Sequence, residues 1–498
     1  MTAASNFAFL RATWAGLHDD AVQAEQNAIA SPRTCAFYAR RTLERAVKWM
    51  FARDSSLRMP YQDSLAAMIH EPTFKAVLPA GLWNQVRMIH KLGNLAVHSE
   101  TRINETDGLQ VTRCLHRLLS WLVKTYEQSA PMVSVFDESL VPRPITKPTV
   151  DRTAEQLQTL QESLKQKDDA FDRSQRDLAA TQEEVDRLRA EIQAIKAANQ
   201  QAAAAVDYDE AETRDLFIDL MLREAGWDPH GPKVAEYQVT GMPNPEGVGY
   251  VDYVLWGDDG LPLAIVEAKR TKASPQKGQR QAELYADCLE RMTGQRPVIY
   301  YSNGYESWLW DDTFYPPRPV QGFATKDELR WMVNRRTERR DLAGATINRS
   351  IVNRYYQEEA IRRVLEVYEI ERARKSLLVM ATGTGKTRVS IATVEILMKR
   401  NWVRRVLFLA DRTALLTQAK RAFASRLPNV SAVNLIEEKE AETTRLVFST
   451  YPTMMNAIDD ARRDGRKRFG PGHFDLVIID EAHRSVYQKY GAIFDYFD

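Results

Sequence analysis

The sequence predicts a multidomain protein in which helical segments near the amino terminus precede two α/β domains. Three observations support this fold class. The chain has 498 residues, more than a single hydrophobic core normally organises. Its first part carries apolar stripes at helical spacing. Its second part alternates strand-like apolar runs with helical patterns and Gly-rich turns. We therefore expect four regions, at residues 1–135, 150–205, 206–325 and 345–498.

The composition is that of an ordinary folded protein. Charged residues make up 27% and hydrophobic residues 44%, and the formal net charge is +1. The global charge balance gives no support to nucleic-acid binding, so any DNA site must be a local basic patch. Cys35, Cys114 and Cys288 lie too far apart to form a zinc site or a disulfide framework. Because no run is long enough to span a bilayer and no signal peptide pattern is present, we expect a cytoplasmic protein.

Residues 1–135 are predicted to form an α-helical domain. Apolar residues recur at helical spacing in 40–51 and 112–123. Some small helical domains are RNases that place an Arg before a catalytic His, but here Asn94 stands before His98. We therefore expect this domain to serve packing or protein docking rather than RNA cleavage.

Residues 150–205 are predicted to form a long helix with coiled-coil character. Apolar residues recur at heptad spacing, at Leu157, Leu164, Phe171, Leu178, Val185 and Ile192. Lys167, Ser174 and Thr181 interrupt the partner positions, which argues against a strong autonomous dimer. A helical arm that packs along a neighbouring element is an equally good interpretation.

Residues 206–325 are predicted to be an α/β domain built on hairpins. Strand patterns occupy 250–256 and 263–269 on either side of a Gly-rich turn. A second hairpin is predicted around the dipeptide Asn303–Gly304. A helix at 210–224 precedes the first hairpin, and these elements are expected to build one sheet.

Three charged residues on the first hairpin indicate a catalytic metal site. Glu267 and Lys269 alternate on one strand and therefore face the same side, and the hairpin brings Asp252 beside them. Such charges are costly on a packed sheet unless they surround a divalent cation. We expect Asp252 and Glu267 to bind Mg²⁺, and Lys269 to position or activate the water that attacks a phosphodiester.

This D…ExK arrangement resembles the PD-(D/E)xK nuclease fold. The pattern occurs by chance in many proteins, but the apolar residues around Glu267 and the acidic Glu212 on the preceding helix strengthen it. Gln281 and Tyr285 on the next helix have the Q-x-x-x-Y spacing of one nuclease subfamily. The resemblance implies that Glu212, Gln281 and Tyr285 join the catalytic set. A solvated hairpin with ordinary surface charges is the alternative.

Residues 345–498 contain the pattern of a phosphate-binding loop, M-A-T-G-T-G-K-T at Met380–Thr387. A predicted buried parallel strand at 376–379 precedes it, and a predicted helix follows it. The glycines allow backbone N–H groups to point at phosphate oxygens, and the helix N-terminus favours negative charge. We expect ATP to be held by Thr382, Gly383, Thr384, Gly385, Lys386 and Thr387.

Within this loop, Lys386 would reach the β- and γ-phosphates, and the Thr387 hydroxyl would hold Mg²⁺. Met380 stands where the general pattern has Gly. Loops of the form A-T-G-x-G-K-T often lack that first Gly, so the departure points to motor ATPases.

A second buried strand, predicted at 474–479, ends in D-E-A-H. In a parallel sheet, a carboxylate at this end of a strand lies beside the phosphate loop. We expect Asp480 to hold Mg²⁺ and Glu481 to orient and deprotonate the attacking water. His483 would couple the nucleotide state to the rest of the motor.

The loop, D-R at 411–412, S-T-Y at 449–451 and the DEAH box together resemble superfamily 2 helicases and translocases, which are built from RecA-like lobes. The resemblance assigns Gln357 to the adenine edge. It also implies a second lobe with an arginine finger. Because the chain ends soon after His483, we expect a fragment of a longer protein that binds ATP weakly at best and does not translocate.

A D…ExK…QxxxY nuclease followed by a superfamily 2 motor resembles the restriction (R) subunit of a type I restriction–modification enzyme. Residues 5–10 and 92–98 resemble the amino-terminal helical domain of type IA R subunits. The resemblance implies ATP-driven translocation of double-stranded DNA coupled to Mg²⁺-dependent cleavage of unmethylated DNA, in complex with methyltransferase (M) and specificity (S) subunits. The alternative is a translocase or remodelling motor whose nuclease-like domain only binds DNA.

Two local basic clusters, at 335–340 and 462–468, are candidate phosphate contacts. The first of them joins the third region to the fourth. Solvated loops are an equally good interpretation of each cluster. No element is suited to reading base sequence in the major groove, a task that the resemblance assigns to the S subunit.

Overall fold

The computed structural model describes residues 5–60, 64–79, 81–99, 102–127, 133–143, 152–178, 190, 192–196, 210–268, 276–304, 306–441, 443–458, 466–482 and 484–497. The chain divides into two compact units. The first comprises Met1–Phe217 with Asp459–Arg468, and the second comprises Ile218–Ile458 with Phe469–Asp498. In the described ranges, no helix has both the length and the apolar character needed to cross a membrane.

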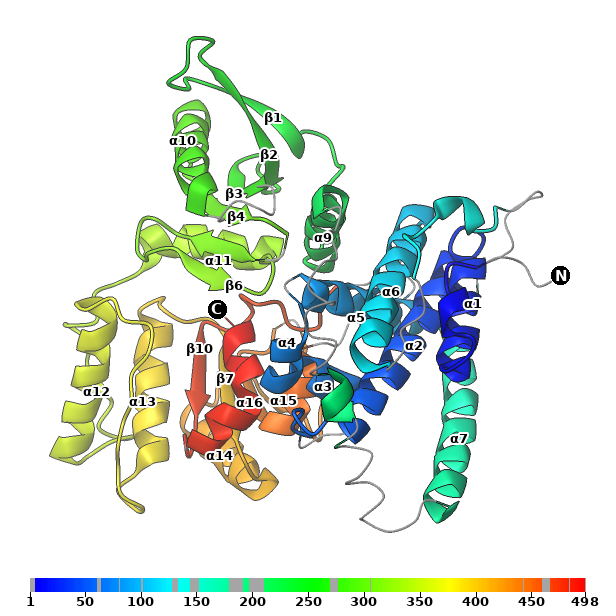
Figure 1. Ribbon diagram of the computed structural model, residues 1–498. Coiled ribbons are helices and arrows are strands. Elements are labelled where there is room, and N and C mark those ends of the chain that lie inside the picture. The colour runs from blue at the N-terminus through cyan, green and yellow to red at the C-terminus, as the bar shows by residue number, and fades with distance from the viewer. Residues whose placement is uncertain are drawn as a thin grey trace. The chain divides into compact units, whose positions relative to one another are not determined.

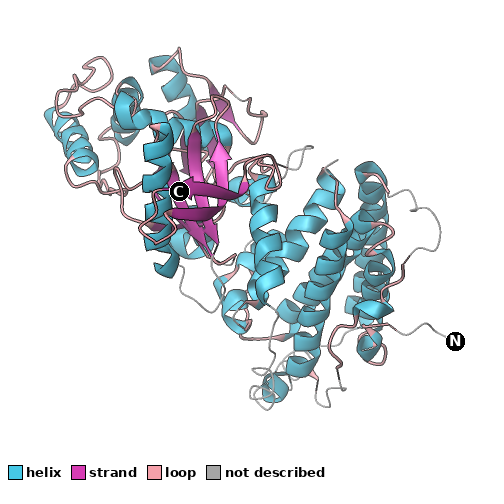
Figure 2. Cartoon of the chain, turned by 90° about the horizontal axis from the view of Figure 1, so that it is seen from above, coloured by secondary structure: helices cyan, strands magenta, loops and turns pink. Residues whose placement is uncertain are grey.

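The described part of the first unit is helical (Figures 1 and 2). Its helices are η1 (Ala8–Leu10), α1 (Ala15–Asn27), α2 (Pro32–Arg53), α3 (Leu65–His70), α4 (Pro72–Val77), α5 (Leu82–His98), α6 (Glu105–Tyr126), η2 (Glu138–Leu140) and α7 (Ala154–Leu178). Pro32 begins α2, and a reciprocal capping box between Asn104 and Asp107 begins α6. The apolar stripes that predicted helices in this region lie within α2 and α6.

The predicted arm packs within this unit over its described residues. α7 lies against α5, and Leu157, one of the heptad positions, is fully buried. Further along, Lys196 and Gln193 both donate hydrogen bonds to Asp54 at 2.7 Å. These contacts match the interpretation of an arm that packs along a neighbouring element, whereas coiled-coil pairing stays a prediction.

Asp54 joins the end of α2 to the end of α6 and to the arm. Its buried carboxylate also accepts hydrogen bonds from Tyr126 Oη and Ser56 Oγ, both at 2.6 Å. Burial alone would raise the pKa of Asp54, but the hydrogen bonds from Lys196, Ser56 and Tyr126 outweigh it and lower the pKa to about 2. A carboxyl group whose pKa is lower in the folded state stabilises that state above its unfolded pKa.

We expect Asp54→Asn to lower the free energy of unfolding at neutral pH by roughly 2–3 kcal/mol, the size of a shift of about two pKa units. The parent protein should lose this contribution as the pH falls from about 4 to about 2. Denaturant unfolding at pH 7 and at pH 3 measures both effects. Asp19→Asn is the control, because that side chain is 82% exposed. Equal losses of stability in the two variants at pH 7 would contradict the prediction.

The second unit contains a six-stranded sheet in the strand order β1-β2-β3-β4-β5-β6. Its strands are β1 (Ala235–Thr240), β2 (Val248–Trp256), β3 (Pro262–Ala268), β4 (Val298–Ser302), β5 (Ser307–Trp310) and β6 (Arg318–Val320). Neighbouring strands are antiparallel except β3 and β4, which α10 (Gln276–Thr293) connects in parallel (Figure 1). Both α10 and α11 (Lys326–Glu338) pack against β3 and β4. The helix α9 (Glu210–Glu224), predicted from the sequence, precedes this sheet.

The second unit also contains a parallel four-stranded sheet in the order β10-β7-β9-β8. Its strands are β7 (Val406–Ala410), β8 (Ala432–Asn434), β9 (Leu446–Thr450) and β10 (Leu476–Ile479). The accompanying helices are α12 (Tyr355–Glu369), α13 (Lys386–Lys399), α14 (Thr413–Arg426), α15 (Tyr451–Ala457) and α16 (Arg484–Tyr496).

Helices cover both faces of this parallel sheet. Alternate residues of β7 enter different cores: Phe408 packs with residues of α12, α13 and α14, whereas Leu407 and Leu409 pack with residues of α15 and α16. Each face of a strand that is covered on both sides must be apolar, which explains the continuous apolar runs that predicted these strands.

The prediction of a buried strand at 376–379 is wrong. Leu377 and Val379 are 77% and 89% exposed, and the segment pairs with no strand in the described parts of the chain. β10 was expected to be buried, but it is an edge strand of the sheet and is only half-buried. An apolar run forms a buried strand only if a neighbouring strand pairs with its backbone and another layer of structure covers its side chains. The apolar pattern by itself gives no information on either requirement.

Candidate functional site

The phosphate-binding loop ends at the N-terminus of α13. Gly383 and Gly385 adopt positive φ angles of +80° and +93°, which residues with a Cβ rarely adopt. Gly385 caps α13, and Lys386 is its first residue. Thr387 is half-buried in the first turn of the helix. The local sequence therefore builds a left-handed turn that leads into a helix N-terminus, which is the arrangement that binds phosphate groups.

Gln357 lies against this loop from the start of α12. Its side chain is 2% exposed, and its Nε2 donates a hydrogen bond to the Thr384 carbonyl at 2.7 Å. A Cβ at Gly385 would come within 2.4 Å of the same Nε2, so the close approach requires glycine. Within the described parts of the chain, the buried Oε1 atom of Gln357 has no hydrogen-bond partner, so it is free to accept a hydrogen bond. An adenine amino group is a suitable donor, and this contact stays a prediction.

The two carboxylates of the D-E-A-H segment lie beside the loop lysine. Lys386 Nζ donates to Glu481 Oε1 at 2.8 Å, and this hydrogen bond raises the pKa of Lys386. Burial raises the pKa of Asp480, and the charge of Lys386 opposes this effect. Glu481 has a φ of +56°, a strained angle for a residue with a side chain. His483 lies outside the described residues.

The predicted metal ligands Asp252 and Glu267 lie on paired strands of the six-stranded sheet. Tyr253 of β2 faces Val266 of β3 in the antiparallel register, so Asp252 stands beside the end of β3. Its Oδ2 accepts a hydrogen bond from the backbone N–H of Ala268 at 2.7 Å. Glu267 is only 2% exposed. The structure thus brings the two carboxylates to one end of the β2–β3 hairpin.

Gln281 and Tyr285 lie on α10, which covers the face of the sheet that carries Glu267. Along β3, Glu267 alternates to the same side as Ile265, and Ile265 packs with Tyr285 in one apolar cluster. Gln281 Nε2 donates to Tyr285 Oη at 2.7 Å, so the two residues of the Q-x-x-x-Y motif are in direct contact. A Cβ at Gly249 would come within 2.7 Å of the Tyr285 ring, so this glycine lets β2 approach α10.

Two predicted catalytic residues are not placed. Lys269 follows β3 directly but lies outside the described residues. Glu212 belongs to α9, and its side chain lies outside the described part of that helix. Their roles beside Asp252 and Glu267 stay predictions.

The pair Asp252 and Glu267 suits a divalent cation. A buried carboxylate such as Glu267 is costly unless a positive charge lies near it. Across the described residues, no cluster of three or more His, Cys, Asp or Glu side chains could hold a metal ion. A cation held by these two residues would therefore take its remaining ligands from water and from the phosphate oxygens of a bound substrate, as Mg²⁺ commonly does.

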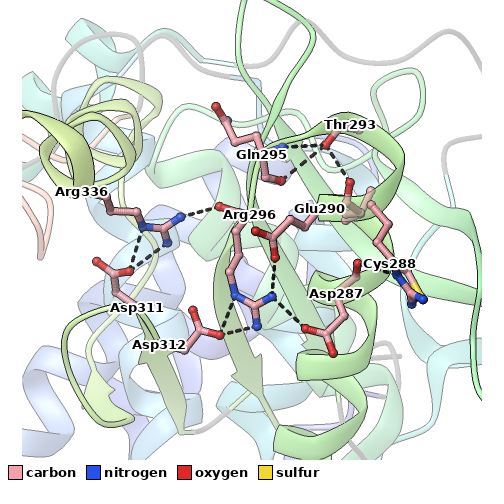
Figure 3. A network of polar contacts seen from close by, with 11 residues as sticks. Asp287, Cys288, Glu290, Thr293, Gln295, Arg296, Asp311, Asp312 and Arg336 are labelled. Atoms are coloured by element: carbon pink, nitrogen blue, oxygen red, sulfur yellow. Dashed lines mark hydrogen bonds and ion pairs between the residues drawn. The ribbon is translucent and has the colours of Figure 1, made fainter.

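Arg296 fixes the far end of α10, a role that no sequence pattern indicates. Its guanidinium donates to Asp312 at 2.7 Å and to Asp287 and Glu290 at 2.8 Å (Figure 3). The hydrogen bond with Asp312, followed by those with Asp287 and Glu290, raises the pKa of Arg296. Arg296 thereby ties the helix that carries Gln281 to the end of β5. The three carboxylates lie 6, 9 and 16 residues from Arg296 and match no recognised motif, so the sequence could not reveal this network.

Residues 350–498 match the family model described as "Type III restriction enzyme, res subunit". The chain is 30% identical over 270 residues to the type I restriction enzyme EcoAI endonuclease subunit of Escherichia coli, a match that covers 49% of this chain and 31% of the relative. It is 26% identical over 345 residues to the type I restriction enzyme EcoKI endonuclease subunit of Escherichia coli strain K12, a match that covers 56% of this chain and 29% of the relative.

Among solved structures, a fragment described as an HsdR subunit of a type I restriction enzyme from Vibrio vulnificus YJ016 matches with 26% identity and a TM-score of 0.23. The match covers 57% of this chain and 53% of that chain. The chain thus spans less than a third of the length of the curated relatives and about half of the solved fragment.

Proposed function

We propose, from the premise that this chain is related to the R subunits of type I restriction enzymes, that it supplies the nuclease and the first motor lobe of an enzyme that couples ATP-driven DNA translocation to Mg²⁺-dependent cleavage of unmethylated double-stranded DNA. One observation carries the proposal: the second unit holds a phosphate-binding loop with its acidic partners and, on a separate sheet, a pair of carboxylates beside a Gln–Tyr pair. We assign residues 206–325 to the nuclease and residues 345–498 to the first motor lobe.

In the proposed motor, the loop residues from Thr382 to Thr387 bind the phosphates of ATP. Thr387 and Asp480 hold the Mg²⁺ that accompanies the nucleotide. The Lys386–Glu481 contact of 2.8 Å supports this arrangement, because it places the proposed water-activating carboxylate within reach of the phosphate-binding lysine. When a γ-phosphate arrives, it would compete with Glu481 for Lys386 and release the carboxylate to orient water.

In the proposed nuclease, Asp252 and Glu267 would hold a Mg²⁺, which when bound would supply an activated water for attack on a phosphodiester. Lys269 would stabilise the developing charge or position the water. The hydrogen bond from the Ala268 amide to Asp252 supports this role, because it holds that carboxylate at the end of β3. Gln281 and Tyr285 would orient the DNA phosphate or the water from α10. Glu212 would complete the acidic set.

Assembly with M and S subunits in the cytoplasm belongs to the same proposal. Recognition of the unmethylated site would come from the S subunit. The amino-terminal helical unit would serve docking.

The test is cleavage of long unmethylated circular DNA by the full-length protein assembled with its M and S subunits. We expect cleavage only when both Mg²⁺ and ATP are present, and no cleavage of fully methylated DNA. DNA-stimulated ATP hydrolysis without any cleavage would instead support the alternative, a translocase or remodelling motor whose nuclease-like domain only binds DNA.

A further inference from the structure

A cavity of about 100 Å³ in the second unit is lined by four arginines among aromatic and apolar residues. Its basic and aromatic lining includes Arg318, Arg335, Arg339, Arg374, Tyr315 and Trp402. Asp475 is the only carboxylate among the lining residues. The cavity therefore concentrates positive charge in a partly enclosed space, although the chain as a whole carries a formal net charge of only +1.

Arg335, on α11, is a buried cation whose charge is only weakly balanced by a nearby carboxylate. The residue is 8% exposed, its Nε is buried with no hydrogen-bond partner among the described residues, and its ion pair with Asp475 spans 3.7 Å. The Asp475 carboxylate accepts hydrogen bonds from neutral donors instead. These are Trp331 Nε1 at 2.7 Å and the backbone amides of Arg404 and Arg405 at 2.8 and 2.9 Å. Asp475 is thus not placed to hydrogen-bond Arg335.

Arg339, one turn further along the chain, is held by aromatic rings. Its guanidinium lies 4.8 Å from the ring centre of Phe314 and 4.4 Å from that of Trp402. Its Nε is also buried without a hydrogen-bond partner. Burial, and then the like charge of Arg335, lower the pKa of Arg339. The rings fix the plane of the guanidinium but supply no anion to its N–H edge.

A neighbour on the same helix shows the contrast. Arg336 donates from Nε to Asp311 Oδ1 at 3.0 Å (Figure 3), and the Asp311 side chain is fully buried. Arg336 is thus held by a carboxylate at hydrogen-bond distance. Arg335 has instead the looser 3.7 Å ion pair with Asp475, and Arg339 is contacted by aromatic rings.

We propose that this cavity binds a phosphate group, of either a nucleic-acid strand or a free phosphorylated nucleotide. Burying cations without an anion is costly, and a phosphate would offset that cost with charge-assisted hydrogen bonds to the planar guanidinium edges. One water needs roughly 10–15 Å³ measured in the same way, so the cavity has room for a phosphate and part of the attached sugar. The site is separate from the loop at Met380–Thr387, and the proposal does not depend on the nuclease or motor assignment.

The test titrates pyrophosphate into the full chain by calorimetry at constant ionic strength. All proteins carry Lys386→Ala, which removes the main cation of the phosphate-binding loop. We expect saturable binding, and we expect Arg335→Gln and Arg339→Gln each to weaken it roughly tenfold or more, the effect of one lost charge-assisted hydrogen bond. Arg362→Gln on α12 is the matched control, because that arginine is exposed and lies outside the cavity. The control should leave the affinity unchanged.

Arg374→Gln keeps the test decisive if a buried variant fails to fold, because Arg374 lines the cavity and is itself exposed. Absence of binding in the Lys386→Ala parent, or equal affinity in the parent and all cavity variants, would overturn the proposal. A single-stranded oligonucleotide without a terminal phosphate then identifies the source of the phosphate. If the cavity variants weaken binding of the oligonucleotide as they weaken binding of pyrophosphate, the ligand is a nucleic-acid strand. If the variants leave the affinity for the oligonucleotide unchanged, the ligand is a free phosphorylated nucleotide.

Discussion

Glu267→Gln is expected to abolish Mg²⁺-dependent DNA cleavage while ATP hydrolysis continues at the rate of the parent protein. The substitution keeps the shape of the side chain but removes the negative charge that would hold the cation beside Asp252. Losing a metal-bound carboxylate removes several kcal/mol of transition-state stabilisation, so cleavage should fall on the order of a thousandfold. Initial rates of cleavage and of DNA-stimulated ATP hydrolysis, measured on the same assembled complex, check this prediction.

The thermal stability of Glu267→Gln distinguishes between two roles for Glu267, a metal ligand and an ordinary surface charge. Glu267 is 2% exposed, so in the absence of Mg²⁺ the neutral Gln should not destabilise the fold. Adding Mg²⁺ should raise the melting temperature of the parent and leave that of the variant unchanged. Glu246→Gln is the control, because Glu246 is exposed in the loop before β2. Cleavage at the parental rate in Glu267→Gln would refute the proposed role.

Lys386→Ala is expected to remove ATP hydrolysis and, with it, all ATP-dependent cleavage. Lys386 is the cation at the start of α13 that would contact the β- and γ-phosphates, and its loss removes charge stabilisation that no other loop residue supplies. We expect hydrolysis to fall by two to three orders of magnitude, roughly the cost of losing one preorganised charged donor. A phosphate-release assay with saturating DNA measures the effect.

Folding should be almost unaffected by this substitution. The Lys386–Glu481 ion pair is largely exposed, and exposed pairs contribute about 1 kcal/mol at most. Lys399→Ala is the matched control on the same helix, since Lys399 is a 70% exposed lysine that pairs with Glu395 and lies outside the loop. Hydrolysis should persist in that control. An Lys386→Ala protein that still hydrolyses ATP at a rate near that of the parent would contradict the assignment of the loop.

Local motifs predicted the parts of the candidate sites that are contiguous in sequence. The positive φ angles of Gly383 and Gly385 follow from the loop pattern, because only glycine adopts them at little cost. The alternation along 250–256 and 263–269 placed Asp252 and Glu267 at one end of a hairpin, and the register of β2 and β3 has this form. In each case a short-range steric rule determines the local geometry.

Features that depend on distant partners could not be predicted. The exposed segment 376–379 shows the strand pattern without strand pairing, because pairing is decided by the rest of the sheet. Arg296 and Arg336 gain their roles from carboxylates far along the chain. The cluster at 335–340 was recognised as basic, but the sequence could not show that Arg335 is buried and Arg336 is paired.

We propose that two chemically independent sites in one chain act in sequence, with ATP hydrolysis preceding cleavage. Cleavage of long unmethylated DNA by complexes of the parent, Glu267→Gln and Lys386→Ala proteins, recorded together with ATP consumption, tests it most directly. Glu267→Gln is expected to consume ATP without cutting DNA, and Lys386→Ala is expected to do neither. Cleavage by Lys386→Ala in the presence of ATP, at the rate of the parent, would contradict it.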